Sequence, residues 1–337
     1  MTEPTRVMAV GTVMVDVLAV GLPHIAEPGH VVYAQHEIES HIGGHPCDVA
    51  IDLAELGYPA DAIGLVAALG DGMYGSYVTE VIRRYDFETF LQRVPTHDTG
   101  KNLVLKVEGE DRRFHIDPGA NWFLDPAHVA DALAHFEPQL LTLRPGYTGI
   151  DLHVAELLSD LTGVLVLLDL MQPHPSRPFD LVIPALPFVD IVHCNRHEAM
   201  AVTGASRLED AVADLLHHGP QVVLLTSGAA GAQAVTSAHT VTQPGLRIDV
   251  VDPTGCGDAF CAGVIEWLVG FASTPTRTTL EGLTPDDLAE LLAHAQAVGA
   301  SAATKTGCVE GVSRRLVDEL RTSQVSRVLA DTRTEAR

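Results

Sequence analysis

The stretch that decides the fold is Asp252-Pro-Thr-Gly-Cys-Gly-Asp258-Ala-Phe-Cys-Ala-Gly263, near the end of a chain of 337 residues. It follows the apolar run Leu246–Val251, for which we expect a strand, and leads into Ala259–Val269, for which we expect a buried helix. The first N–H groups of a helix have no acceptor within the helix, and they lie at the positive end of its dipole. Residues 255–257 would therefore present backbone N–H groups to an anion, and their glycines would let a phosphate approach closely.

Asp258 follows these glycines directly. In a phosphate site, its carboxylate would be the base that takes the proton from a hydroxyl group attacking the γ-phosphate. Two simpler interpretations stay open. The carboxylate can be an ordinary first-turn residue stabilised by the helix dipole, and the glycines can serve only the close packing of the helix against a strand.

Three further segments place polar residues or glycines where a strand ends or a helix begins. Asn195-Arg-His-Glu198 and Thr226-Ser-Gly228-Ala-Ala-Gly231 each follow an expected strand, where open α/β sheets bind ligands. Gly43-Gly44 opens an expected helix whose first turn carries Asp48, a residue able to bind a polyol. Singly, these segments can be a helix N-cap, a hairpin turn and an ordinary helix start. Together, they favour a phosphate-transfer site.

Apolar strands alternate with amphipathic helices, which is typical of an α/β fold with a mainly parallel central sheet covered on both faces. We expect one domain over residues 1–330 and a frayed polar tail at 331–337. Short polar/apolar alternation at about 31–39 and 101–118 predicts a small projecting β-sheet lid, with two edge strands of the main sheet as the alternative. The other expected strands are Val7–Val20, Ala62–Leu69, Leu140–Leu143, Val164–Leu168, Val189–Cys194 and Val222–Thr226. The expected helices are Val49–Leu56, Gly75–Arg84, Asp151–Leu161, His197–Thr203 and Leu208–His217.

Composition excludes several classes of protein. A net charge of −23 repels nucleic acid and anionic membranes, although a GC-rich or salt-adapted genome would give the same composition. The apolar runs are too short to span a membrane and the first residues do not resemble a signal peptide, so we expect a cytoplasmic protein. Five widely spaced cysteines without a CxxC pair indicate neither a disulfide framework nor a zinc site.

Over nearly its whole length, the sequence resembles the PfkB or ribokinase family of carbohydrate and nucleoside kinases. The family's D-T-x-G-A-G-D signature is matched by Asp252–Asp258, with Pro253 and Cys256 as the two differences. The resemblance implies a ribokinase-like three-layer α/β/α fold with a lid, and ATP and Mg²⁺ as cosubstrate and cofactor. It assigns Asp258 as the base and the backbone amides of Gly255, Cys256 and Gly257 as the anion hole.

Further residues are assigned by the same resemblance. The N-x-x-E motif corresponds to Asn195–Glu198, in which Glu198 places Mg²⁺ through water. On the sugar side, the motifs correspond to Asp16, Gly43 and Gly44, and Pro118–Asn121 is similar to the end of the lid sheet. The nucleotide site implied by the family comprises Asn195, Glu198, Thr226, Gly228, Gly231, Gln296 and Gly307. A monovalent cation such as K⁺ would lie between Asp252 with the Thr254 carbonyl and the loop Gly307–Ser313.

Three departures from the family put ribose in doubt as the substrate. Asp48 replaces an Asn that binds sugar hydroxyls, and an ionised Asp accepts hydrogen bonds without donating them. Met14 replaces another polar contact. Arg144 lies near an acidic substrate contact of ribokinases and would favour a carboxylate or phosphate on the substrate, with a purely structural arginine as the alternative.

We therefore expect an ATP-dependent kinase that phosphorylates a hydroxyl, primary by preference, of a sugar or sugar-like substrate. A nucleoside kinase of the same family is one alternative. Gly70-Asp-Gly-Met-Tyr-Gly75 also matches G-x-G-x-x-G, so an NAD-dependent oxidoreductase is a second alternative, and a non-catalytic binding protein on the kinase fold is a third. The sequence has no G-x-x-x-x-G-K-[ST] motif, which excludes a P-loop kinase. An exposed lid sheet would allow a homodimer through the lids.

Overall fold

The computed structural model describes residues 3–110, 112–171 and 182–337. Its main sheet consists of β1 (Val7–Val10), β4 (Ile63–Gly70), β5 (Glu88–Val94), β8 (Leu140–Leu143), β9 (Leu165–Asp169), β10 (Ile191–Asn195), β11 (Val222–Thr226), β12 (Ala232–Val235), β13 (His239–Gln243) and β14 (Arg333–Ala336). The strand order is β14-β13-β12-β11-β10-β9-β8-β1-β4-β5, parallel from β11 to β5 and antiparallel at β12, β13 and β14.

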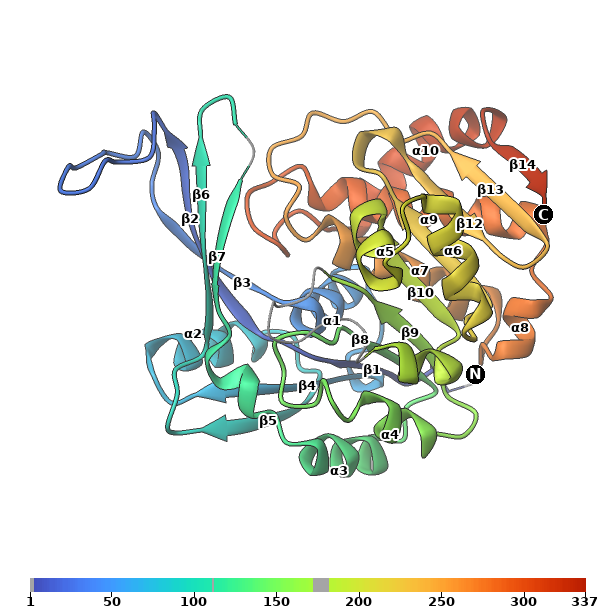
Figure 1. Ribbon diagram of the computed structural model, residues 1–337, viewed down its shortest axis with the longest axis horizontal. Helices are drawn as coiled ribbons and strands as arrows, with labels where there is room; N and C mark the ends of the chain where they lie inside the picture. The colour runs from blue at the N-terminus through green and yellow to red at the C-terminus, as the bar shows by residue number, and fades with distance from the viewer. Residues whose placement is uncertain (1–2, 111, 172–181) are drawn as a thin grey trace.

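Helices cover both faces of this sheet (Figure 1). The described helices are α1 (His45–Glu55), α2 (Met73–Ile82), α3 (Pro126–Phe136), α4 (Val154–Ser159), α5 (Arg196–Thr203), α6 (Leu208–His217), α7 (Cys256–Phe271), α8 (Arg277–Glu281), α9 (Pro285–Ala302) and α10 (Arg314–Ala330). Neighbouring strand residues belong to different cores because successive side chains point to opposite faces. Leu65 packs with the apolar residues of α1, α2, α7 and α9, whereas Val66 packs with those of α3, α4, α5 and α6.

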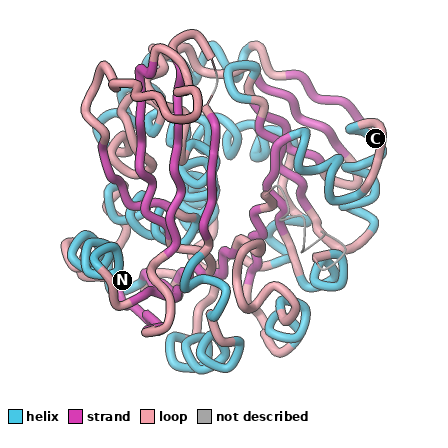
Figure 2. The backbone as a smooth tube through the Cα atoms, turned by 60° about the vertical axis from the view of Figure 1, so that its left-hand side comes forward, coloured by secondary structure: helices cyan, strands magenta, loops and turns pink. Residues whose placement is uncertain are grey.

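A second, smaller sheet stands beside the main body (Figures 1 and 2). It consists of β2 (Met14–Leu22), β3 (Glu39–Gly43), β6 (Gly100–Val107) and β7 (Arg113–Asp117), in the order β3-β2-β6-β7. This sheet is the projecting lid expected from the alternating pattern of 101–118. In the alternative arrangement, these strands would have extended the main sheet, and they do not.

Four expected details are wrong. The expected strand 7–20 is two strands, because the chain leaves β1 and enters the lid as β2. Residues 31–38 are not a strand, and lid pairing begins only at Glu39. Residues 246–251 are not a strand either, because the backbone amide of Val251 donates to Ala303 O instead of to a sheet. The tail expected to fray forms β14, whose backbone pairs with the open edge of β13.

The match to G-x-G-x-x-G has a structural explanation. Gly70 ends β4, and a Cβ at this position would lie 2.3 Å from His97 O; a Cβ at Gly75 would lie 1.9 Å from Gly70 O. These glycines therefore serve close backbone packing. In the described part of the chain, no helix is long and apolar enough to cross a membrane.

Candidate active site

The N-terminus of α7 is the centre of the site. Gly255 is its N-cap, with φ of 75°, and a Cβ there would lie 2.5 Å from Cys308 O, so only glycine fits. Gly257 is open instead, since a Cβ there would contact only His193 Cε1 at 3.5 Å. The signature thus forms the helix N-terminus that the sequence predicts, with first-turn amides lacking intrahelical acceptors.

Four parallel strands end near this helix. Arg144 follows β8, Asp169 ends β9, Asn195 ends β10 and Thr226 ends β11, which is the edge where open α/β sheets bind ligands. These four residues and Gly257 line one cavity of about 500 Å³. Charged and polar side chains therefore surround the amides at the start of α7.

Asp258 lies within a hydrogen-bonded network of buried side chains. Its Oδ1 is 2.7 Å from His45 Nδ1 and 2.8 Å from Arg144 Nη2. Arg144 also donates to Asp169 Oδ2, through both Nε and Nη2. His45 Nε2 lies 2.7 Å from Thr142 Oγ1, so both nitrogens of this fully buried ring have a partner.

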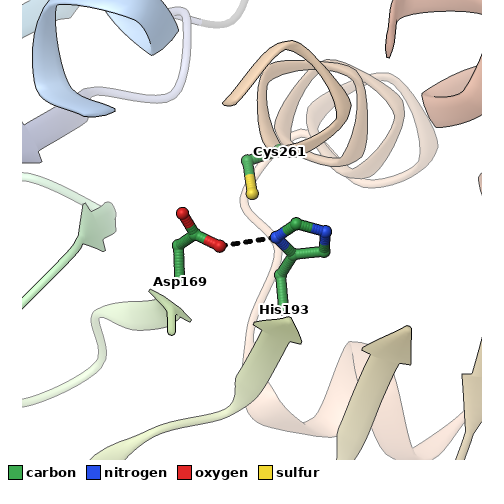
Figure 3. Close-up of side chains that lie close together, drawn as sticks. All are labelled: Asp169, His193 and Cys261. Carbon is green, nitrogen blue, oxygen red and sulfur yellow. Dashed lines mark hydrogen bonds and ion pairs between the residues drawn. The ribbon is translucent and has the colours of Figure 1, made fainter. Parts of the chain in front are cut away.

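The same network continues toward Thr226 at the end of β11. Asp169 Oδ1 accepts from His193 Nδ1 at 2.6 Å, as Figure 3 shows. His193 Nε2 lies 3.3 Å from Thr226 Oγ1, and the His193 ring stacks on Phe260 with centroids 5.1 Å apart. A chain of contacts thus links the end of β11 to Asp258 on α7.

Opposite charges stabilise this network. Burial lowers the pKa of His45, but its hydrogen bonds to Asp169 and Asp258 outweigh burial and raise that pKa above the ordinary value. Burial alone would raise the pKa of Asp169, but Arg144 and His193 hold it well below its usual range. Cations beside a buried carboxylate favour its charged form.

Cys261 lies beside this pair, and its Sγ is within 4.8 Å of the ligand atoms of Asp169 and His193 (Figure 3). Burial raises the pKa of the Cys261 thiol well above its usual range, and only the thiolate binds metals well. Asp169 and His193 are already joined by their short hydrogen bond. We therefore interpret the three as a hydrogen-bonded cluster packed against a thiol.

A second cavity, of about 650 Å³, adjoins the first. Gly228, Gly231, Gln296 and Cys256 line it, and it shares Thr226 and Gly257 with the first cavity. Residues 228–231 connect the antiparallel strands β11 and β12, so they form a hairpin turn and a cavity wall at once. This cavity has the size for a nucleotide base and sugar.

Gly307, expected in the nucleotide site, lies elsewhere. Its amide donates to Asp252 Oδ2 at 3.2 Å, and a Cβ there would collide with Glu310 and with His41 of β3. It is not among the described residues lining the second cavity. It belongs to the contact between the lid and the loop before α7.

Asn195 and Glu198 form a capping box at the start of α5. Asn195 Oδ1 accepts from the amides of His197 and Glu198, and Glu198 Oε2 accepts from the amide of Asn195. Glu198 lines the first cavity, and no described group donates to its Oε1. A carboxylate oxygen on the wall of such a cavity could hold Mg²⁺, directly or through water. The Asn195 side chain, by contrast, is committed to the N-cap.

The residues expected on the sugar side lie where the lid meets α1. Asp16 is buried on β2, where its Oδ1 accepts from Asn102 Nδ2 at 2.9 Å and its Oδ2 from Cys308 Sγ at 3.2 Å. Gly43 ends β3 beside Asp16, and Gly44 is the N-cap of α1 with φ of 98°. The structure therefore brings all three expected residues together.

Asp48 is fully buried on α1, and its Oδ1 has no partner among the residues that the structure describes. Burial, and then the charge of Asp258, raises its pKa well above the usual range. A protonated Asp offers one O–H donor and one acceptor, as an Asn amide does. With its pKa raised in this way, Asp48 can donate as well as accept, whereas the sequence led us to expect an acceptor only.

The lid turn reaches the signature through Arg112. Its Nη1 lies 2.5 Å from Thr254 Oγ1 and 3.3 Å from Asp252 Oδ1. Asp252 Oδ1 also accepts from the Thr254 amide and hydroxyl, and its Oδ2 from the amide of Gly307. The Asp252 carboxylate is thus surrounded by donors that include a cation, which does not fit K⁺ bound by that carboxylate.

Sequence reasoning missed several of these residues. His45 directly follows Gly43-Gly44, and Asp169 ends an apolar strand, so both stood at positions that the sequence already marked. His193 lies inside an apolar strand and Arg112 in a charged turn, where no sequence pattern distinguishes them. Arg144 was expected to contact the acceptor, and the structure shows it in contact with the carboxylate of Asp258.

Known structures share this fold. The chain superposes on ribokinase from Giardia lamblia with a TM-score of 0.79, covering 95% of this chain and 99% of that one at 20% identity. For ribokinase from Thermotoga maritima, the TM-score is 0.74, with 95% and 100% covered and 21% identity. Fold and strand-end site together define a ribokinase-like α/β protein.

Sequence comparison gives the family. The model of the pfkB family of carbohydrate kinases matches residues 4–315, so the chain belongs to that family and is a kinase by class. It is 27% identical to fructokinase of Klebsiella pneumoniae, over 79% of this chain and 87% of that one. It is 26% identical to aminoimidazole riboside kinase of Salmonella typhimurium, over 87% and 90%.

Proposed function

We propose that this protein transfers the γ-phosphate of ATP to a primary hydroxyl group of a sugar or sugar-like substrate, with Asp258 as the general base. The observation that carries the proposal is the position of Asp258. It lies in the first turn of α7, directly after the cavity-lining Gly257 and in contact with the cavity-lining Arg144. On its other side it is close enough to Asp48 for its charge to raise the pKa of that residue. Family membership supports the reaction class.

The roles follow from the contacts. Asp258 Oδ1 accepts from His45 and Arg144, so Oδ2 is the oxygen left to take the proton of the acceptor hydroxyl. The first-turn amides at Gly257 would stabilise the charge on the transferring phosphoryl group. Mg²⁺, held through Glu198, would supply neutralising charge at the phosphate oxygens. Closure of the lid would exclude water.

The acceptor pocket favours a polyhydroxylated ligand. Asp16, with Asn102 beside it, and a protonated Asp48 offer both acceptors and donors to neighbouring hydroxyls. Sugars and nucleosides both satisfy this pattern. A nucleoside kinase therefore remains the second candidate, and the relative named aminoimidazole riboside kinase favours including a riboside among the substrates tested.

The decisive experiment measures ATP consumption with D-fructose, D-ribose, a sugar acid and aminoimidazole riboside as acceptors. Asp258→Asn should lower kcat by roughly 10²–10⁴-fold with the affinity for ATP retained. Near-normal turnover in this variant would refute the base assignment. Stabilisation of the protein by NADH but not by ATP with Mg²⁺ would refute the kinase proposal as a whole.

Two further expectations belong to the proposal. We expect a homodimer through the lid sheets, since Leu103, Phe114 and Ile116 of β6 and β7 are 39–49% exposed. Light scattering of the purified protein tests it, and a monomer at working concentration would exclude it. We also expect the protein in the cytoplasm, which cell fractionation tests.

A further inference from the structure

Arg144 occupies an unusual position for a residue expected to contact the acceptor. Its side chain is 19% exposed, and that exposed part faces the phosphate cavity, which it lines together with Glu198, Thr226 and Gly257. One edge of the guanidinium, Nε and Nη2, is held by Asp169. Among the described residues, no group accepts a hydrogen bond from Nη1.

The anchoring of this guanidinium is stronger than a structural arginine requires. Asp169 is buried and ionised, and it accepts from His193 as well as from Arg144. Nε and Nη2 of Arg144 both donate to one carboxylate oxygen, Asp169 Oδ2, and these two contacts along one edge fix the direction of the remaining N–H groups of the planar guanidinium. The network therefore pre-orients Nη1 before any ligand arrives.

Distance then decides what Nη1 can reach. Arg144 Nη2 lies 2.8 Å from Asp258 Oδ1. A general base must lie within about 3 Å of the attacking hydroxyl, and that oxygen must approach the phosphorus to about 3–3.5 Å. A guanidinium in contact with the base is consequently within a few ångströms of the oxygens of the transferring phosphoryl group.

We infer that Arg144 is a catalytic residue that donates from its Nη1 edge to the γ-phosphoryl oxygens during transfer, with Asp169 as its positioning residue. This inference rests on the proposed function. In the step, the acceptor oxygen forms a bond to the γ-phosphorus and the bond to the β,γ-bridging oxygen breaks. That electron pair leaves with ADP, and the hydroxyl proton goes to Asp258 Oδ2. Arg144 gains or loses no proton and stabilises the charge that spreads over the phosphoryl oxygens.

The test compares Arg144→Gln and Arg144→Lys with Arg207→Gln, which alters an exposed arginine at the start of α6. With the acceptor that serves the wild-type enzyme, Arg144→Gln should lower kcat by roughly 10²–10³-fold. The KM values for ATP and acceptor, and the Kd for ADP with Mg²⁺, should change little. Added guanidinium ion should restore part of the rate in Arg144→Gln and none in Asp258→Asn. Arg207→Gln should behave as wild type.

A wild-type kcat in Arg144→Gln overturns the inference. A change confined to a higher KM for the acceptor also overturns it, because Arg144 would then act in substrate recognition. If Arg144→Gln fails to bind ADP with Mg²⁺, Arg144→Lys decides. A lowered kcat at unchanged KM supports the inference, and an unchanged kcat overturns it. An active Arg144→Gln beside an inactive Asp258→Asn refutes only this inference, whereas a wild-type protein that phosphorylates none of the acceptors refutes the proposed function.

Discussion

Asp52 offers a quantitative test of the buried charge beside the active site. It lies on α1 one turn after Asp48, is fully buried, and has no hydrogen-bond partner for either carboxylate oxygen among the described residues. Burial, followed by the charges of Asp258 and Glu55, raises its pKa well above 3.8. The folded protein therefore retains a proton on Asp52 at pH values where the unfolded chain has released it.

The sign of the effect follows from this difference. Stability falls with rising pH wherever the folded state binds more protons, so Asp52 destabilises the fold progressively above its unfolded pKa of about 3.9. The free energy of unfolding drops by about 1.4 kcal/mol per pH unit until the folded pKa is reached. Asp52→Asn removes this titration. The free energy of unfolding of the variant should therefore rise relative to that of the wild type by about 1.4 kcal/mol per pH unit in that interval.

Urea unfolding at several pH values from 5 upward, followed by circular dichroism, measures this gain. The charge of Asp52 contributes to the raised pKa of Asp48, so both proteins are compared in an Asp48→Asn background. The remaining acids then contribute alike, and their contributions cancel in the difference. Asp131→Asn, at an exposed position of α3, is the control and should give a difference independent of pH. A constant difference for Asp52→Asn would refute the reasoning, because it would mean that Asp52 is ionised in the fold.

Three further predictions concern the acceptor pocket and the lid. Asp48→Asn should keep most of the activity, because the amide reproduces the donor and acceptor of a protonated Asp, whereas Asp48→Ala should raise the acceptor KM by about tenfold or more. Steady-state kinetics checks both, and an inactive Asp48→Asn would show that the ionised form is needed. Turnover of the wild type should be the same in K⁺ and Na⁺, because Arg112 already provides a cation beside Asp252; Arg112→Gln should become responsive to K⁺. A strong K⁺ requirement in the wild type would contradict this. His41 has a pKa raised to about 9, chiefly by its hydrogen bond to Glu310, so its stabilising contribution is complete below pH 6.5 and is lost as the pH rises through about 9. The fall in Tm from pH 7 to pH 10 should therefore be smaller in His41→Gln than in the wild type. An equal fall in both proteins would argue against the interaction of His41 with Glu310.

The elements that sequence reasoning located best are buried parallel strands and a strongly amphipathic helix. The bounds of Leu140–Leu143, Val222–Thr226 and Leu208–His217 agree with the structure, because a parallel strand buried on both faces and an amphipathic helix each leave an unambiguous pattern. The strand predicted at residues 246–251 is wrong because an apolar run that lines a cavity has the same composition as a strand. The strand at residues 333–336 was not predicted because a polar edge strand forms by pairing with the backbone of β13. Its own side chains do not indicate that pairing.

In the site, too, features that depend on nearby residues could be predicted and features that depend on the folded chain could not. Local motifs predicted the helix N-terminus at Gly255 and gave an N-cap as one interpretation of Asn195. The family pattern assigned Asp16 and Gly43 to the sugar side, and the structure places the two residues side by side. The partners of Asp258 could not be predicted in this way. His45 and Arg144 come from α1 and from the end of β8, and only the folded sheet brings them to one carboxylate oxygen. The state of Asp48 likewise depends on burial, which the sequence does not state.

The C-terminal strand has a bearing on how this protein can be engineered. β14 covers the outer edge of β13, and Thr332, just before it, accepts from Gln243 Nε2 at 3.1 Å. Gln243 Oε1 in turn accepts from Gln296 at 3.0 Å, and Gln296 lines the second cavity. Removing residues 332–337 would expose a strand edge prone to association and release a wall residue of the cavity together. A fusion attached close to Arg337 would disturb the lining of the second cavity as well as solubility if it displaced β14 from β13.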